Sequence, residues 1–387
     1  MRMTSGDLMC FSHLRWGFVF QRPNHLMVRF ARHYRTFFVE EPIDAADDAA
    51  PSMDITPHPD GVIVCTPRLP RGRSAAEREQ LQRELVQQLV RNHRIEPHVL
   101  WFYTPMALPL AAGMTASVVV YDCMDELSAF DGAPPELVER ERHLFARADV
   151  IFTGGHSLYQ AKRDKHPAVF AMPSSVDAGH FAKARQPVQD PADQAELPRP
   201  RLGFFGVIDE RLDLELVAAI AEARPQWHLV MLGPVVKIDP ARLPRRDNLH
   251  WFGSKSYAEL PAYLASWDVA MMPFARNRST EFISPTKTLE YLAAGRPVVS
   301  TAITDVVHPY GDEGLVRIAD RPAEFIAAIA AALAEDPRPR IAAADACIAR
   351  TSWDITFARM KERMASAAHR GRILEISAEE GASCSTI

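Results

Sequence analysis

The sequence has 387 residues, of which 47% are hydrophobic and 24% are charged, and its formal net charge is −5. This composition excludes a wholly disordered chain, and the length favours two α/β domains of roughly 150–200 residues each. The negative net charge argues against nonspecific nucleic-acid binding as the main role. The five cysteines are scattered without a C-x-x-C pair, which favours reduced cytosolic thiols over disulfides or a zinc site.

Apolar runs of membrane-spanning length are missing from the sequence, and its first twenty residues lack the apolar core of a signal peptide. We therefore expect a cytoplasmic protein without a membrane-spanning segment. Peripheral association with the inner membrane stays open because arginines recur at Arg22, Arg29, Arg32 and Arg35. A solvated helix face is the alternative that this spacing favours.

In the first half of the chain, short β-branched or aromatic runs alternate with amphipathic segments, which is typical of a parallel α/β sheet. The expected strands are residues 7–12, 36–41, 61–66, 98–103, 116–121 and 148–153. Segment 74–93 has leucines at helical spacing between charged residues and predicts a helix. Asp44, Asp47 and Asp48 fit a solvated loop, because they do not form the D-x-D spacing of a carboxylate metal site, and no metal is expected.

Acidic residues follow the strand expected at 116–121. Ligands of parallel sheets gather at the carboxyl ends of strands, where a carboxylate can accept a proton from a hydroxyl or stabilise positive charge. Asp122 and Asp125 are therefore candidate catalytic residues, with Asp125 favoured and helix capping as the alternative for each. His156 follows the next strand, where it either reaches the same region or caps a helix.

The second half begins after a proline-rich segment, 183–200, which is typical of a linker between domains. Residues 201–207 predict a strand, but they lack the G-x-G-x-x-G motif, which argues against a nicotinamide oxidoreductase. Strands and helices are then expected to alternate again. A last amphipathic helix starts near Trp353, and the polar tail after Ile373 is expected to be disordered.

The stretch 284–301 carries a helix start, a helix stop and a strand. Ser284 is a candidate helix cap and Pro285 suits the first turn, so an anion is favoured at this helix N-terminus by roughly 0.3–2 kcal/mol. The positive charge of Lys287 is unfavourable at the positive end of the helix dipole, unless a polyanion binds beside it and offsets the repulsion. Glu290 lies one turn further and can accept hydrogen bonds from vicinal sugar hydroxyls. An ordinary surface helix is the alternative.

Three strings of this sequence resemble one family. P-x-K-x-x-E-Y-x-A-x-G-x-P-V-V, from Pro285 to Val299, resembles the nucleotide-sugar site of the retaining group 1, family 4-like glycosyltransferases with the GT-B fold. W-x-x-x-x-Q-R-P, from Trp16 to Pro23, and Y-D-x-x-D-E, from Tyr121 to Glu126, resemble a branch of that family in bacterial polysaccharide biosynthesis, including teichuronic-acid-type enzymes.

The resemblance implies two Rossmann-like, doubly wound α/β domains that face each other across a cleft. The implied divisions are an acceptor-side domain at 1–182, a linker at 183–200 and a nucleotide-sugar-binding domain at 201–352, followed by a helix at 353–372 that packs back on the first domain and a disordered tail at 373–387.

The resemblance also implies roles for residues. Glu290 corresponds to the glutamate that binds the donor ribose, and Arg211 and Lys287 are placed to neutralise the diphosphate, so they join the catalytic candidates. The donor-binding candidates are Gly17, Gly206, Ser254, Lys255, Glu281, Ser284, Pro285, Thr286, Lys287 and Glu290. The acceptor-side candidates are Gln21, Arg22 and His156.

Two departures from the family pattern stand out. The family places a second acid eight residues before the ribose-binding glutamate, but Phe282 occupies that position here and Glu281 precedes it. The usual Lys-Gly pair after the strand at 201–207 is absent, and Arg211 is the nearby cation.

The implied reaction moves a sugar from a UDP- or GDP-sugar to a hydroxyl of a glycan or lipid-linked acceptor. Retention at the anomeric carbon is implied, and neither a metal nor a cofactor is expected. Two alternatives remain open: a noncatalytic partner of glycan assembly with the same fold, and an isomerase or hydrolase acting on a nucleotide sugar.

Overall fold

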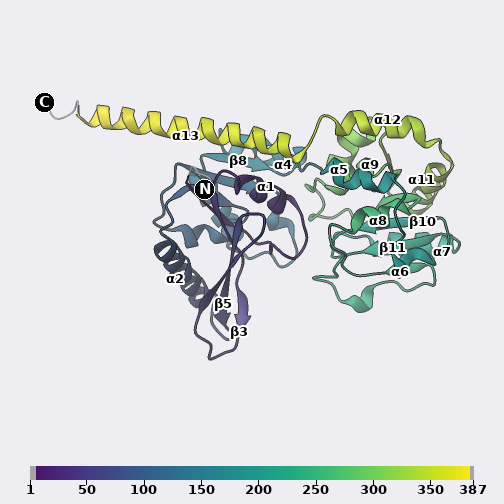
Figure 1. The fold of residues 1–387 in the computed structure, drawn as a ribbon, viewed down its shortest axis with the longest axis horizontal. Helices are drawn as coiled ribbons and strands as arrows, with labels where there is room; N and C mark the ends of the chain where they lie inside the picture. The colour runs from purple at the N-terminus through teal and green to yellow at the C-terminus, as the bar shows by residue number, and fades with distance from the viewer. Residues whose placement is uncertain (1–5, 384–387) are drawn as a thin grey trace.

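The structure is a computed structural model that describes residues 6–383, with side chains described through residue 369. It contains two α/β domains side by side, and the C-terminal helix returns from the second domain to run along the first (Figure 1). The two Rossmann-like domains expected from the sequence are confirmed.

Within the described residues, nine strands form the sheet of the first domain in the order β3-β5-β2-β1-β6-β7-β8-β9, with β4 paired to β5. All pairings are parallel except that of β4 with β5. The strands are β1 Asp7–Phe11, β2 Arg35–Val39, β3 Ile43–Ala45, β4 Ser52–Pro57, β5 Val62–Pro70, β6 Pro97–Phe102, β7 Val118–Cys123, β8 Val150–Thr153 and β9 Val169–Ala171.

The segment around Asp44, Asp47 and Asp48 differs from the expected solvated loop, because strands β3 and β4 flank it. Both strands pair with the long strand β5 at the sheet edge, and β4 is largely exposed. The apolar signal of these strands is weak because neither is buried on both faces.

Helices cover the first sheet. They are α1 Arg22–Phe30, α2 Ala75–His93, α3 Leu137–Arg147 and α4 His156–Lys162, with the short 3-10 helices η1 Pro105–Ala111 and η2 Leu127–Ala129. Helix α2 begins where the sequence predicts it, because Ser74 and Glu77 form a capping box.

Six further strands in the described part of the chain form a parallel sheet in the order β12-β11-β10-β13-β14-β15. They are β10 Arg201–Phe205, β11 His228–Leu232, β12 Leu249–Trp251, β13 Val269–Met272, β14 Val298–Ser300 and β15 Val316–Ile318. The helices are α7 Leu214–Ala223, α8 Leu260–Ala265, α9 Lys287–Ala293, α10 Thr304–Val306, α11 Pro322–Ala334 and α12 Pro337–Ile348. This strand order reverses direction beside β10, and ligands of doubly wound sheets bind outside the strand ends at such a point.

The segment between the domains is packed rather than free. It contains the short helix α6 Ala192–Ala195, and the short helix α5 Ala178–Phe181, whose Phe181 is buried in the second-domain core, precedes it. Gln194 is fully buried and bonds to Trp267 and to the carbonyl of Tyr263 in the second domain. This proline-rich segment therefore packs along the second domain.

Helix α13, Trp353–Ser383, returns the chain to the first domain. Trp353 stacks on His25 with ring centroids 4.5 Å apart, and Met360 and Met364 are buried in the first-domain core. The two segments that pass between the domains touch where the hydroxyls of Ser175 and Thr351 lie 2.8 Å apart.

The tail expected to be disordered from 373 is helical as far as Ser383, and residues 384–387 lie outside the described part. Alanine, glutamate and leucine in this segment are good helix formers, which favours continuation of the helix.

Of the four recurring arginines, Arg22 and Arg29 lie in α1, Arg32 follows it and Arg35 begins β2. Arg22 is buried, Arg29 pairs with Asp354 at 2.8 Å, and Arg35 pairs with Asp7 at 2.7 Å. Among the described residues, no helix combines the length and apolar character that crossing a bilayer requires.

Candidate functional site

Two adjoining cavities open where the carboxyl ends of both sheets meet. The smaller, which we call the interdomain cavity, has a volume of about 170 Å³. The larger, the adjoining cavity, has a volume of about 510 Å³. Phe20 of the first domain and Gly206 and Tyr257 of the second line both. The two cavities therefore form one continuous cleft between the domains.

Most of the residues predicted for the site gather here. The interdomain cavity is lined by Gln21, Arg22, Asp125, Gly206, Arg211, Ser284, Pro285, Thr286, Lys287 and Glu290. The adjoining cavity is lined by Gly17, Ser254 and Lys255. Residues of the sequence stretches 16–23, 121–126 and 285–299 therefore meet at one place.

Lys287 is the first residue of α9, and its side chain passes over Gly206. A Cβ atom added to Gly206 would lie 2.2 Å from Cε of Lys287, and Gly206 has a φ of +149°, so glycine is required there. Burial lowers the pKa of Lys287, while the nearby Glu290 carboxylate acts in the opposite direction. This is a cation held against the backbone at the end of β10.

Helix α9 starts later than the sequence predicts. Its N-cap is Thr286, and Ser284 is not the capping residue. Thr286 already has helical dihedral angles, and the backbone N–H of Thr288 donates to Pro285 O at 3.2 Å, so Ser284 and Pro285 form the approach to the helix. Ser284 still lines the interdomain cavity.

Glu290 lies one turn into α9 and is 8% exposed. Burial raises the pKa of its carboxyl group to about 7, although Lys287 opposes the shift. Burial raises the pKa of the Tyr257 hydroxyl, and the nearby Glu290 charge raises it further. This buried hydroxyl has no hydrogen-bond partner among the described residues. The Tyr257 ring stacks on His180 at 4.2 Å and lies 4.8 Å from that of Phe20. The interdomain cavity is therefore lined by Glu290 and by Tyr257, whose hydroxyl lacks a hydrogen-bond partner among the described residues.

Arg211 and Asp125 approach the interdomain cavity from opposite domains. Nε and Nη2 of Arg211 donate to the Asp209 carboxylate at 3.0 and 2.6 Å, and its guanidinium lies 5.4 Å from the ring centroid of Phe130 in the first domain. Burial raises the pKa of Asp125, and the charges of Arg211 and Arg22 oppose that shift. Asp209 thus orients the cation that faces Asp125.

An ion pair with Lys162 anchors the loop that carries Asp125. Nζ of Lys162 lies 2.6 Å from the Glu126 carboxylate and 2.7 Å from that of Glu141. Burial opposes the charged form of Lys162, but its neighbours Cys123, Glu141 and Glu126 raise its pKa overall. Glu126 is therefore a structural neighbour of Asp125.

Asp122 does not face the cleft. It is fully buried and accepts hydrogen bonds from Nε of Arg22 at 3.1 Å and from Nη2 at 2.8 Å. Arg22 also donates to Met172 O at 2.6 Å, so its guanidinium is engaged inside the domain although its side chain borders the cavity. This buried ion pair and the absence of Asp122 from the cavity lining argue against the catalytic role expected for Asp122, whereas Arg22 still borders the interdomain cavity.

His156 and Glu281 also lie elsewhere. The backbone N–H of His156 donates to Asp305 at 2.8 Å, and His156 lines another cavity, which shares Ser174 with the interdomain cavity. Glu281 is exposed and lines neither cavity of the cleft, whereas Phe282 packs against the first-domain core.

Lys255 lines the adjoining cavity, but its ammonium is already paired. It lies 2.6 Å from the Asp193 carboxylate and 5.3 Å from the ring centroid of Tyr263. Within the part of the chain with described side chains, no group of three His, Cys, Asp or Glu residues is arranged to hold a metal ion.

Sequence reasoning missed several residues of the cleft. Tyr257, Phe130 and Asp209 carry no motif, and only their tertiary neighbours reveal them. Asp209 offered one signal, because an acid two residues before Arg211 can bind its guanidinium within the turn.

Residues 199–335 match the family model "Glycosyl transferases group 1", a span that begins just before β10 and ends just after α11. These residues make up most of the second domain, which therefore matches group 1 glycosyl transferases, and the findings support a glycosyltransferase with the GT-B fold.

A relative from Bacillus subtilis (strain 168), "Putative teichuronic acid biosynthesis glycosyltransferase TuaH", is 27% identical over 283 residues, which are 67% of this chain and 69% of the relative. This relative agrees with the polysaccharide branch that the sequence strings indicate.

Solved structures share the fold at low identity. One, described as trehalose-6-phosphate from E. coli bound with UDP-2-fluoro glucose, has a TM-score of 0.68 and 10% identity and covers 93% of this chain and 99% of that chain. Sucrose-phosphate synthase from Thermosynechococcus elongatus has a TM-score of 0.67 and 14% identity, with 97% and 100% covered. Anabaena HepE in complex with UDP and glucose has a TM-score of 0.66 and 13% identity, with 93% and 100% covered.

Proposed function

We propose that the protein transfers a sugar from a nucleotide diphosphate sugar to a hydroxyl of a glycan or lipid-linked acceptor, with retention at the anomeric carbon, in polysaccharide biosynthesis. The observation that carries this proposal is the grouping of Glu290, Lys287 and Arg211 around one interdomain cavity. The Bacillus subtilis relative supports the polysaccharide context, and the E. coli and Anabaena structures hold UDP-2-fluoro glucose and UDP.

In this proposal Glu290 accepts hydrogen bonds from the vicinal hydroxyls of the donor ribose. A buried carboxylate without other partners forms strong charge-assisted bonds with such donors. Lys287 and Arg211 lie against the departing diphosphate. Two fixed cations in a water-poor cleft stabilise charge that develops on a leaving group, so the donor needs no metal or cofactor in this scheme.

Asp125 lies on the acceptor side of the same cavity. Its carboxylate, held across from Arg211, orients the acceptor hydroxyl or stabilises positive charge on the sugar ring. The departing phosphate takes the hydroxyl proton in this scheme. The presence of Lys287 and Arg211 in the cleft favours this reaction over the noncatalytic alternative, which has no use for paired cations.

The test is thermal stabilisation of the purified protein by UDP, GDP and their sugars. A ligand at a hundred times its Kd adds about 2.7 kcal/mol of stability, which a melting curve resolves. We expect one diphosphate to raise the Tm of the wild type, and Glu290→Ala to abolish this shift because the ribose contact is lost.

The matched control is Glu281→Ala, which removes an exposed carboxylate nine residues away that lines neither cavity. This variant should keep the wild-type shift. Wild-type nucleotide affinity in Glu290→Ala would rule out the assignment of the donor site.

A further inference from the structure

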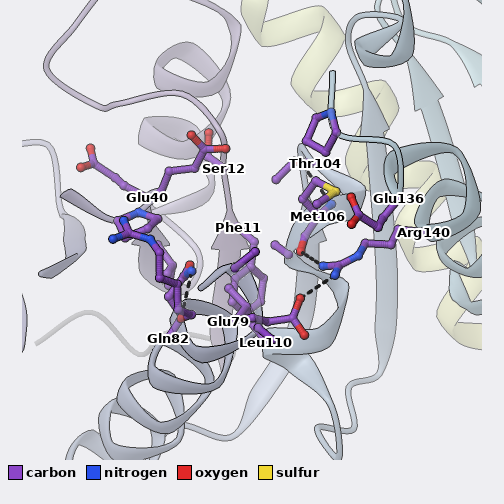
Figure 2. Close-up of a pocket in the computed structure, with 18 residues that line it drawn as sticks. Phe11, Ser12, Glu40, Glu79, Gln82, Thr104, Met106, Leu110, Glu136 and Arg140 are labelled. Atoms are coloured by element: carbon purple, nitrogen blue, oxygen red, sulfur yellow. Dashed lines mark hydrogen bonds and ion pairs between the residues drawn. The ribbon is translucent and has the colours of Figure 1, made fainter. Parts of the chain in front are cut away.

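A third cavity lies entirely within the first domain and has a volume of about 720 Å³. We call it the first-domain cavity. It opens beyond the carboxyl ends of β1 and β2 and is enclosed by α2, η1 and the start of α3. Figure 2 shows its side chains converging from these elements. None of the site residues predicted from the sequence lines it.

The cavity combines apolar surface with unused hydrogen-bonding atoms. Phe11 and Leu110 are buried apolar residues in its wall. The Ser12 hydroxyl accepts from Leu14 N at 3.0 Å and keeps its own hydrogen to donate. Nε2 of Gln82 donates to Arg78 O at 3.3 Å, which leaves its carbonyl oxygen to accept. Such walls suit a ligand with C–H faces and hydroxyl edges.

The charge of this cavity is negative. Its charged lining side chains are Glu40, Glu41, Glu79, Glu136, Arg78 and Arg140. Both arginines are already paired, because Arg140 lies 2.6 Å from Glu79 and Arg78 lies 2.9 Å from Asp44. Glu41 and Glu136 form no side-chain ion pair within the described residues, so a phosphate or carboxylate ligand would meet repulsion without a free cation.

Two chain segments border both this cavity and the interdomain cavity. Segment 12–21 begins at the first-domain cavity with Ser12 and reaches the interdomain cavity with Gln21. Segment 125–136 does the reverse, from Asp125 to Glu136. A ligand in the first-domain cavity therefore rests on the same segments that form the acceptor side of the transfer site.

The second of these segments is held by the other domain at its middle. The ring of Phe130 lies 5.4 Å from the Arg211 guanidinium and 4.9 Å from Nζ of Lys237. The segment therefore connects the cation that faces the donor with the wall of the first-domain cavity.

We propose that the first-domain cavity binds an uncharged, hydroxyl-bearing sugar unit of the acceptor and discriminates against units that carry phosphate or carboxylate. This inference rests on the proposed function and specifies the chemistry of the acceptor. The volume admits a sugar unit, the walls match its faces and edges, and the unpaired carboxylates repel anions.

The experiment uses saturation-transfer NMR on the full chain. The probes are methyl glycosides of glucose, galactose, mannose and N-acetylglucosamine, compared with glucuronic acid and glucose 6-phosphate at equal concentration. We expect saturation transfer to at least one neutral glycoside and a signal from the two anions no larger than that of a sample without protein.

Gln82→Trp fills the cavity and should remove the glycoside signal. Gln88→Trp is the matched control, because Gln88 is exposed on the same helix and does not line the cavity. Ala75→Trp, in the exposed first turn of α2, narrows the cavity from a second position and should act like Gln82→Trp.

Equal binding of the anionic probes, or glycoside binding that survives both filling variants, would overturn the proposal, as would no glycoside binding at all. A nucleotide-binding measurement distinguishes failure of this proposal from failure of the proposed donor site. Gln82→Trp should keep the diphosphate-induced Tm shift, whereas failure of the donor site changes that shift and leaves the glycoside signal intact.

Discussion

The Glu290 carboxyl group changes its charge near neutral pH, because burial raises its pKa to about 7. Burial makes the ionised form costly because it removes much of the water that would solvate the carboxylate. A donor hydroxyl that reaches this carboxylate offsets part of the cost. The ionised Glu290 carboxylate is thus less favourable in the free protein than in a complex with the donor, as is common for ligand-binding groups.

This shift gives a pH-dependent prediction. The folded pKa lies above the ordinary value of 4.5, so the folded state binds more protons and the free energy of unfolding falls as pH rises from about 5 to about 7. Glu290→Gln lacks this loss. We expect the variant to be more stable than the wild type at pH 8 by roughly 1–3 kcal/mol, with no advantage near pH 5, as measured by urea unfolding.

The control for this prediction is Glu281→Gln, which changes an exposed carboxylate. Its stability difference from the wild type should be small at both pH values. A stability difference for Glu290→Gln that does not depend on pH would contradict the assignment of the raised pKa.

At the scale of elements, the end of β7 separates two acids that look alike in the sequence. Asp122 points into the domain and pairs with Arg22, whereas Asp125 reaches the cleft on a loop anchored by Lys162. The pairing of Asp122 depends on a residue a hundred positions away. The residues next to Asp122 and Asp125 in the sequence therefore do not show which acid is buried in an ion pair and which reaches the cleft.

The two acids should respond differently to removal of charge. Asp122→Asn leaves Arg22 buried without its counter-charge, so we expect a loss of about 3–5 kcal/mol in the free energy of unfolding. Asp125→Asn should keep near-wild-type stability and lose turnover of the donor identified by the thermal screen. Urea unfolding and a product assay measure the two effects. A stable Asp122→Asn variant with wild-type unfolding would refute the structural role of the pair.

Much of the fold was predictable because buried parallel strands read as continuous apolar runs, as in β6 and β7. The edge strand β4 was missed since its exposed residues carry no such run. In the site, the string from Pro285 to Val299 placed Lys287 and Glu290 correctly in the cleft. The sequence pattern placed the capping residue at Ser284, whereas α9 begins at Lys287 with Thr286 as its N-cap.

At the scale of the molecule, the two domains are joined across the cleft by a carboxylate at a helix N-terminus. Asp305, from α10 of the second domain, accepts hydrogen bonds from the backbone N–H groups of His156 and Ser157 at 2.8 and 2.9 Å. Gly155 permits this approach, because a Cβ there would lie 2.1 Å from Asp305 Oδ2. These contacts favour the domain arrangement that the structure shows.

Asp305→Ala removes the contact and should shift the free protein toward open arrangements. We expect a larger radius of gyration by small-angle X-ray scattering without ligand, and a return toward the wild-type value when the diphosphate is bound. Asp312→Ala serves as the control, since Asp312 pairs locally with His308. An unchanged radius of gyration for Asp305→Ala would show that the contact does not hold the domains together.

The Ser175 and Thr351 hydroxyls bring the two crossing segments within 2.8 Å of each other. When two adjacent connections join two rigid bodies, they define an axis, and displacement grows with distance from it. Ser174, next to this axis, lines the interdomain cavity. The part of the interdomain cavity near Ser174 is therefore expected to move least when the domains rotate about this axis.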